Sequence, residues 1–241
     1  MTPLIQSTLF AIVAAFANVI GGLIVTRHNW ARQSLRYFIA LGAGFMLGTV
    51  FLEMVPESFR LSSSAPVLIL LGYLIVHTFE HVFASHLHFG EETHHEELTN
   101  PAVGLSALVG MLVHTFFDGV AIGAAFMISE SLGFLVFLAV FLHKIPDGFT
   151  ISSIIVSSGY SPARALAAAT SLGLSTLAGV IAVHIVGNVV DYALPISTGS
   201  TLYVAATDLM PEANREKGVR MAFLVFAGMG LFFLVRLVAQ G

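Results

Sequence analysis

Long apolar stretches separated by short polar breaks fill almost the whole of this 241-residue chain. A transmembrane α-helix needs about 20 consecutive, mostly apolar residues to cross the hydrocarbon core of a bilayer. The apolar stretches are continuous rather than short and alternating, which excludes a transmembrane β-barrel. We therefore expect an all-α membrane protein, with residues 1–241 in a single transmembrane domain. Its eight spans are predicted near 4–26, 35–59, 65–84, 101–128, 133–158, 162–188, 194–212 and 218–238.

The composition excludes other classes of protein. Charged residues make up 10% of the chain and apolar residues 56%, with a mean hydropathy of +0.89. A soluble domain has roughly 25% charged residues, and a disordered chain combines low hydrophobicity with high charge. The net charge of −4 and the lack of a basic run argue against nucleic acid as a partner. Because cysteine is absent, disulfides and thiolate metal sites are excluded.

The basic residues predict how the chain is oriented in the membrane, since Lys and Arg favour the cytoplasmic side. With eight spans, only Arg60 and Arg236 fall on the same side as the two termini. The opposite side holds Arg27, Arg32, Arg36, Arg164, Arg215, Lys217 and Arg220. This split predicts a multi-pass protein of the plasma or inner membrane with both termini outside the cytoplasm. No Lys or Arg precedes the first span, so we expect a retained helix rather than a signal peptide.

Spans four and five carry the same motif, H-x-x-x-D-G, at residues 114–119 and 143–148. An ionisable side chain near mid-bilayer costs roughly 2.5–3.5 kcal/mol, so it is retained for a partner, a cavity or a function. Residues four apart share one face of a helix, so each span presents an imidazole and a carboxylate together. Two His and two Asp on adjacent helices suit Zn²⁺, Fe²⁺, Co²⁺ or Mn²⁺. The candidate ligands are His114, Asp118, His143 and Asp147.

A single pair of this kind could instead be a buried hydrogen bond between His and Asp. Two copies at matching depth on neighbouring spans favour metal coordination. The glycine after each Asp, Gly119 or Gly148, allows a neighbouring helix to approach closely. Pro146 withdraws a backbone donor and frees the carbonyl one turn earlier, which is a common way to open polar backbone to an ion path.

A second pair of motifs predicts an inverted repeat. Span two ends in E-x-x-P-E at 53–57, and span seven ends in D-x-x-P-E at 208–212. These spans run in opposite directions, so the two motifs lie at opposite faces of the membrane, and spans four and five are likewise opposed. This is the pattern of a 3+2+3 inverted repeat with the site at its centre. Helix capping could explain the Glu after each proline, but it explains the earlier acid less well.

On these motifs, their order and their spacing, the sequence resembles the ZIP family of divalent-metal transporters over essentially its whole length. The H-K-x-P sequence at 143–146 is similar to the branch whose eukaryotic members sit in Golgi and plasma membranes. The resemblance implies a homodimeric transporter, not an enzyme, that carries a divalent metal into the cytoplasm. Zinc is the favoured substrate, with Fe²⁺, Mn²⁺, Co²⁺ and Cd²⁺ as further candidates. The implied mechanism is an elevator, in which spans one, four, five and six slide against the others.

Two positions depart from the two-metal pattern of the family. Members often have Asn after the first His and Glu after the second, and these residues help to hold a second metal. Here the corresponding residues are Thr115 and Lys144. A protonated Lys has no lone pair to donate. We therefore predict a single-metal site, in which Lys144 replaces the second cation or balances the charge of Asp118 or Asp147.

The resemblance also implies a path for the metal, with Glu53 at the entrance and Asp208 at the exit. Between spans three and four, residues 85–100 form a cytoplasmic loop rich in His and Glu. This composition predicts weak metal binding, because a merely acidic, solvated loop would not require four histidines. The candidate loop ligands are His86, His88, His94 and His95, and His77, Glu80 and His81 lead into the loop on one helical face.

Two other functions stay open at this point. A metal exporter of the cation-diffusion type also uses H-x-x-x-D pairs, but such proteins usually have six spans and a cytoplasmic C-terminal domain. An intramembrane zinc hydrolase needs an open metal position and a positioned water, and the sequence has no H-E-x-x-H motif. The chain also lacks the G-x-x-x-x-G-K-[ST] loop, so we do not expect it to hydrolyse ATP.

Overall fold

A computed structural model describes residues 1–27, 32–83, 101–215 and 219–240 of the chain. In these ranges every regular element is a helix, and six helices are long and apolar enough to cross a membrane. Residues Ala65–His81 form a shorter apolar helix. The remaining expected span, near 194–212, is also helical, although it contains buried Ser and Thr residues. The prediction of an all-α membrane protein is therefore confirmed.

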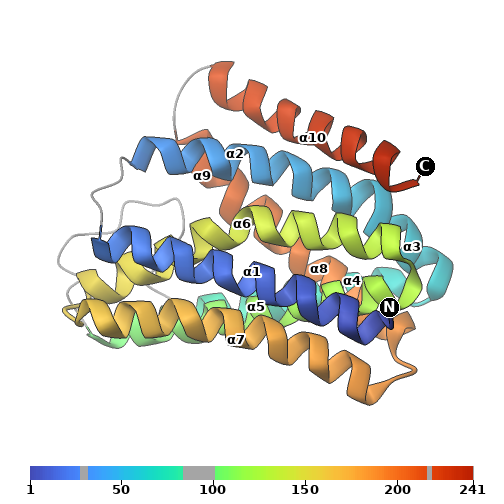
Figure 1. Cartoon of the computed structure of the whole chain (residues 1–241), viewed down its shortest axis with the longest axis horizontal. Helices are drawn as coiled ribbons and strands as arrows, with labels where there is room; N and C mark the ends of the chain where they lie inside the picture. The colour runs from blue at the N-terminus through green and yellow to red at the C-terminus, as the bar shows by residue number, and fades with distance from the viewer. Residues whose placement is uncertain (28–31, 84–100, 216–218, 241) are drawn as a thin grey trace.

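Eight continuous helical segments make up the described part of the chain. The first four are α1 (Pro3–Arg27), α2 (Arg32–Thr49) continued by η1 (Val50–Met54) and α3 (Val55–Leu61), α4 (Ala65–Phe83) and α5 (Pro101–Ile128). The others are α6 (Glu130–Ser157), α7 (Pro162–Val186), α8 (Val190–Tyr203) continued by η2 (Val204–Leu209) and α9 (Met210–Asn214), and α10 (Val219–Gln240). The two termini lie at the same end of the molecule, as an even number of crossings requires (Figure 1).

Local signals in the sequence set several helix ends. The side-chain oxygen of Ser129 accepts the backbone N–H of Leu132 at the start of α6, and Ser161 caps α7 in the same way through Arg164. Helix α7 ends at Gly187, whose φ of +77° is readily adopted only by a residue without a Cβ. These caps keep the connections to the neighbouring helices short.

The helices form two groups. In the first group, α1 and α5 each pack against α6 and α7. In the second group, α10 packs on α2, and α4 packs on α8 (Figure 1). The groups meet where α5 contacts α4 and α8, and where α6 contacts α2. Helices α5 and α6, which carry the two H-x-x-x-D-G motifs, therefore lie at the boundary between the groups.

Matching π-helical turns occur in the two segments that carry the second motif pair. The N–H of Val55 donates to the carbonyl of Val50, and the N–H of Met210 donates to that of Ala205, each five residues back. Each donor immediately precedes a proline, Pro56 or Pro211 in the motif, whose ring cannot continue an α-helical ladder. The internal repeat seen in the sequence is thus present in the backbone as well.

Two glycines allow backbones of the first group to touch. A Cβ added to Gly119 of α5 would lie 1.9 Å from the carbonyl oxygen of Thr176 in α7. A Cβ added to Gly148 of α6 would lie 1.9 Å from that of Asn18 in α1. The prediction that the glycine after each motif Asp permits close helix approach is confirmed. These contacts join α5 to α7 and α6 to α1 as closely packed pairs.

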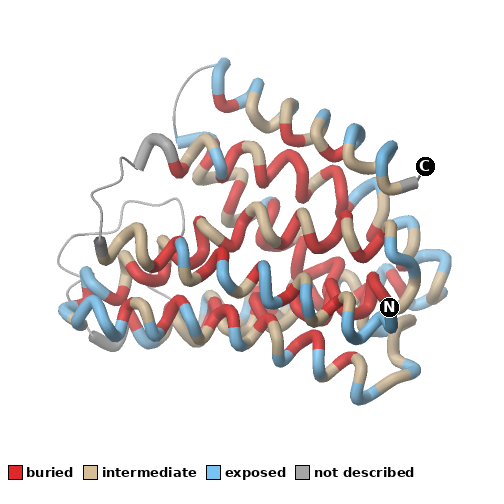
Figure 2. Tube along the Cα trace, in the orientation of Figure 1, coloured by how far each residue is buried: buried red, intermediate tan, exposed pale blue. Residues whose placement is uncertain are grey.

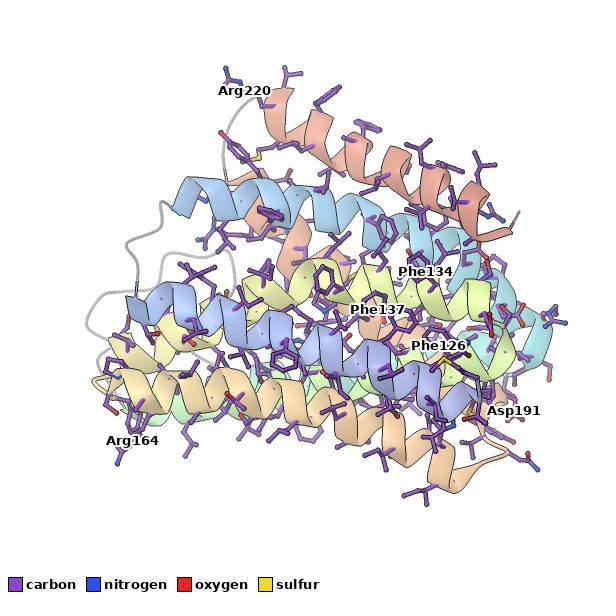
Figure 3. The ribbon with its side chains drawn as sticks, in the orientation of Figure 1. Phe126, Phe134, Phe137, Arg164, Asp191 and Arg220 are labelled. Atoms are coloured by element: carbon purple, nitrogen blue, oxygen red, sulfur yellow. The ribbon has the colours of Figure 1, made fainter. Side chains whose placement is uncertain are left out.

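An aromatic cluster closes the same group near the N-terminus. Phe126 of α5 and Phe134 and Phe137 of α6 lie together in Figure 3. Phe10 of α1 packs among them, with its ring centroid 5.2 Å from that of Phe126 and 4.6 Å from that of Phe137. This cluster links α1, α5 and α6 at one end of the bundle. Deeper in the bundle, the glycine contacts join α5 to α7 and α6 to α1.

The burial pattern fits a lipid environment. Buried segments follow the faces that the helices turn toward one another, and exposed segments follow the outer edges (Figure 2). Large apolar side chains are exposed on α4 and α10, among them Val67, Leu70, Phe223 and Phe226. Water would disfavour such surfaces, whereas the hydrocarbon core of a bilayer suits them.

Candidate metal site

The four candidate ligands from α5 and α6 converge on one buried place. The Nε2 atom of His114 lies 3.4 Å from Oδ2 of Asp147, and Nε2 of His143 lies 3.3 Å from Oδ2 of Asp118. The second imidazole is also 3.7 Å from Oδ2 of Asp147. The close pairs therefore join His and Asp residues between the helices as well as within α6. All four residues are buried.

Three of the four candidate ligands lie close enough together that they could hold a metal ion. One ligand atom from each of His114, Asp118 and Asp147 can be chosen so that all three lie within 4.8 Å of one another. In the described part of the chain, the buried Oδ1 atom of Asp118 has no hydrogen-bond partner. A buried carboxylate oxygen without a hydrogen-bond partner is available to coordinate a cation.

The backbone orients the ring of His143. Its Nδ1 atom donates a hydrogen bond of 3.0 Å to the carbonyl oxygen of Ala139, one turn earlier in α6. This bond leaves the lone pair on Nε2 for a ligand. With Nδ1 carrying the proton, Nε2 and the carboxylate oxygens of Asp118 and Asp147 all face one another as lone-pair donors. Such a set needs a shared proton or a cation to be stable.

Lys144 supplies a cation inside the site. Its Nζ atom lies 2.5 Å from Oδ2 of Asp118 and 3.4 Å from Oδ2 of Asp147, and its side chain is fully buried. The ammonium therefore contacts both carboxylates. Thr115 is different, because its hydroxyl donates to the carbonyl oxygen of Leu112 in its own helix. With neutral imidazoles, two carboxylates and one ammonium leave the site with a single negative charge.

Glu80 of α4 is a neighbour of the site that the sequence analysis did not assign to it. Its Oε1 atom lies 3.6 Å from Nδ1 of His114, so it approaches the site from the other group of helices. Asp208 lies nearby on η2, interacts electrostatically with Glu80, His114 and Asp147, and accepts a 3.2 Å hydrogen bond from Thr207. The position of Glu80 within an apolar helix is a signal that could have assigned it to the site, but its spacing from His77 and His81 points equally to the following loop.

Glu53, expected at the entrance, forms an ion pair with Arg236 of α10, with 2.6 Å between Oε1 and Nε. At the opposite end of the second group, Glu212 lies 3.4 Å from Nε of Arg36 and 3.0 Å from Nε of Arg215. Both acids therefore have basic partners. The sequence analysis assigned these arginines only to the orientation of the chain in the membrane.

The predicted loop ligands His86, His88, His94 and His95 lie outside the described residues. The helix that leads toward them places two imidazoles together, because the rings of His77 and His81 are 4.0 Å apart between centroids. The Nδ1 atom of His81 also donates to the carbonyl oxygen of His77, 3.0 Å away. Metal binding by the loop stays a prediction.

The sequence of the chain matches that of a known protein family. The sequence model of the family described as ZIP Zinc transporter matches residues 85–236, which include both H-x-x-x-D-G motifs. The chain belongs to the ZIP zinc transporter family. The family resemblance drawn from the motifs is thereby confirmed.

Individual proteins similar to this ZIP chain are also named as zinc transporters. Zinc transporter ZIP9 of Micropogonias undulatus is 24% identical over 266 residues, an alignment that covers 86% of this chain and 84% of the relative. Zinc transporter ZIP9 of Xenopus tropicalis is 25% identical over 248 residues, with coverage of 81% and 80%. Zinc transporter SLC39A7 of Homo sapiens is 32% identical over 137 residues, with coverage of 52% and 29%. These names fit a ZIP transporter better than an exporter of the cation-diffusion type or a zinc hydrolase.

Proposed function

We propose that this ZIP chain carries divalent metal ions, above all zinc, across the membrane into the cytoplasm through a single intramembrane site. The observation that carries the proposal is the convergence of His114, Asp118, His143 and Asp147 at the boundary between the two helix groups. Two imidazoles and two carboxylates suit Zn²⁺, and also Fe²⁺, Mn²⁺, Co²⁺ and Cd²⁺. The zinc-transporter names of the relatives support the same substrate class.

The proposal that the site holds a single metal ion is based on the position of Lys144. Its ammonium lies within 3.4 Å of both carboxylates, in the place where a second divalent ion would need its ligands. A second ion would be repelled by the ammonium and would receive no lone pair from it. Lys144 therefore acts as a built-in monovalent cation that offsets one of the two negative charges of the buried carboxylates when no metal is bound.

An elevator mechanism fits the way in which the site is built. The four ligands belong to α5 and α6, and close backbone contacts at Gly119 and Gly148 join these helices to α7 and α1. A displacement of α1, α5, α6 and α7 as a unit would carry all four ligands together. Glu80 of α4 stays on the other side of the boundary, so its 3.6 Å approach to His114 would change during that movement.

The proposed path runs from Glu53 at the outer end, through the four ligands, to Glu80 and Asp208. The Glu80 carboxylate lies 3.6 Å from His114, and the charges of both residues act on Asp208. A cation leaving the ligands toward the cytoplasm would next meet these two acids. The His-rich loop at 85–100 would then bind the released metal weakly.

We further propose that the protein is a homodimer in the plasma or inner membrane, with both termini outside the cytoplasm. The exposed apolar faces of α4 and α10 offer surface for a second copy as well as for lipid. The uneven distribution of basic residues along the sequence, two on the side of the termini against seven on the other side, supports this orientation.

Zinc flux in proteoliposomes tests the proposed function. The wild-type chain is expected to take up external zinc, and H143A is expected to reduce the initial rate at least about tenfold, because a ligand is lost. H184A is the matched control, since His184 of α7 instead contacts Oγ of Ser7 at 2.9 Å. Competition by Fe²⁺, Mn²⁺, Co²⁺ and Cd²⁺ ranks the substrates. Outward movement alone would favour an exporter, and lipid cleavage without flux would favour a hydrolase.

A further inference from the structure

The inverted repeat makes Glu53 and Asp208 equivalent residues. Each acid lies in a π-helical turn, three residues before a proline. The segment that holds Glu53 packs on α10, and the segment that holds Asp208 packs on α4. Helices α4 and α10 are themselves the third helix of each repeat. The side chains that face the two acids can therefore be compared directly.

This comparison reveals an inversion of charge. The α4 residue whose charge acts on Asp208 is another acid, Glu80. Glu53 faces Arg236 of α10 instead, with its Oε1 atom 2.6 Å from Nε of the guanidinium. In one half of the repeat the motif acid thus has an acid of the third helix as its charged neighbour, whereas in the other half it contacts a cation.

The contact between Glu53 and Arg236 is shielded from solvent. The side chains are 16% and 35% exposed, and the two contacting atoms are buried. Shielding strengthens the attraction between opposite charges relative to an ion pair in water. Arg60 forms a contrasting pair with Glu57 at the same end, where its side chain is 70% exposed. Water and salt weaken an exposed pair of this kind.

We propose that Arg236 is a specificity-determining residue at the outer end of the path, where it holds Glu53 and so sets how strongly external cations are attracted. This proposal rests on the proposed transport function. A divalent ion that arrives at Glu53 has to displace the guanidinium before it can use the carboxylate. A strongly binding ion such as zinc can do so more readily than a weakly bound one such as Mg²⁺.

Uptake kinetics in proteoliposomes test the role of Arg236. R236Q frees Glu53, so we expect the KM for zinc to fall about three- to tenfold, with kcat changed less than about twofold. Inhibition of zinc uptake by external Mg²⁺ should become stronger in the same variant. R60Q removes one positive charge from the same end without touching Glu53, and it should leave the KM at the wild-type value.

A double-mutant cycle links the effect to Glu53. In the E53Q background, the added change R236Q should no longer lower the KM, because there is no carboxylate left to release. R236K keeps the charge and should stay near wild type, and R236M replaces R236Q if that protein does not reconstitute. An unchanged KM in R236Q and R236M, or an equal fall in R60Q, would overturn the role proposed for Arg236 but leave the proposed transport function intact. Failure of the wild-type chain to move zinc would overturn the proposed function itself.

Discussion

Lys144 and Asp118 form a fully buried contact between α6 and α5, with Nζ of the lysine 2.5 Å from Oδ2 of the aspartate. The same ammonium reaches Asp147 at 3.4 Å. A buried charge is tolerated in a membrane protein when it is paired. The contact therefore explains how two carboxylates can remain ionised in the interior, ready for a metal, without any metal being bound.

The first prediction concerns the number of metal ions that the site holds. K144E removes the resident cation and adds a carboxylate beside Asp118 and Asp147, so the purified variant should bind close to two zinc ions per chain. The wild type should bind one ion in the described site. Elemental analysis of the purified protein provides the measurement. K144Q, which removes the charge but adds no anion, is the control and should stay near one. A stoichiometry of one in K144E would contradict the role given to Lys144.

A second prediction concerns the stability of the protein without metal. D118N leaves Lys144 buried with only its longer contact to Asp147, and breaking a buried ion pair in this way costs about 3–5 kcal/mol. The melting temperature in detergent and chelator should therefore fall clearly. Adding K144M to D118N removes the stranded charge and should recover most of the loss. If the double variant were less stable than D118N, the contact would matter for packing rather than for charge.

Close helix packing in the first group gives a third prediction. G148A places a Cβ 1.9 Å from the carbonyl oxygen of Asn18, so α1 and α6 must move apart, at a cost of about 1–3 kcal/mol or more. G230A is the control, because a Cβ at Gly230 of α10 meets nothing within 4 Å. The melting temperature of G148A should fall, and that of G230A should stay level or rise. Similar melting temperatures for the two variants would contradict the proposal that α1 and α6 are packed closely enough to move as a unit.

Much of the architecture can be predicted from the sequence, because the sequence patterns that determine it involve residues close together in the chain. Apolar runs set the helices, and the i, i+4 spacing places His114 with Asp118 and His143 with Asp147 on their helix faces. The glycines after the aspartates indicated close packing for the same reason. Because only 10% of the residues are charged, few positions in the sequence can form a polar site within the membrane.

The features that the sequence did not reveal depend on how helices rotate against one another. Glu80 has two imidazoles on its helix face, at His77 and His81, and only the docking of α4 on α5 turns it toward His114. The pairing of Glu53 with Arg236 likewise joins residues from the second and last spans. Proline marked the motif in the second and seventh spans, but whether such a helix kinks or adopts a π turn depends on the neighbours that receive the displaced backbone.

A fourth prediction tests the inner acidic pair. Because Glu80 lies across the group boundary from His114, it should assist release of the metal toward Asp208 more than initial binding. E80Q should therefore lower the kcat of zinc uptake several-fold, while the KM changes less than about twofold. E130Q is the matched control, because Glu130 is an exposed residue at the start of α6 whose carboxylate accepts a hydrogen bond from Gln6 at 2.6 Å. A rise in KM with an unchanged kcat in E80Q would instead make Glu80 a ligand of the initial binding site, and a movement of α5 and α6 past α4 would no longer be needed to explain its position.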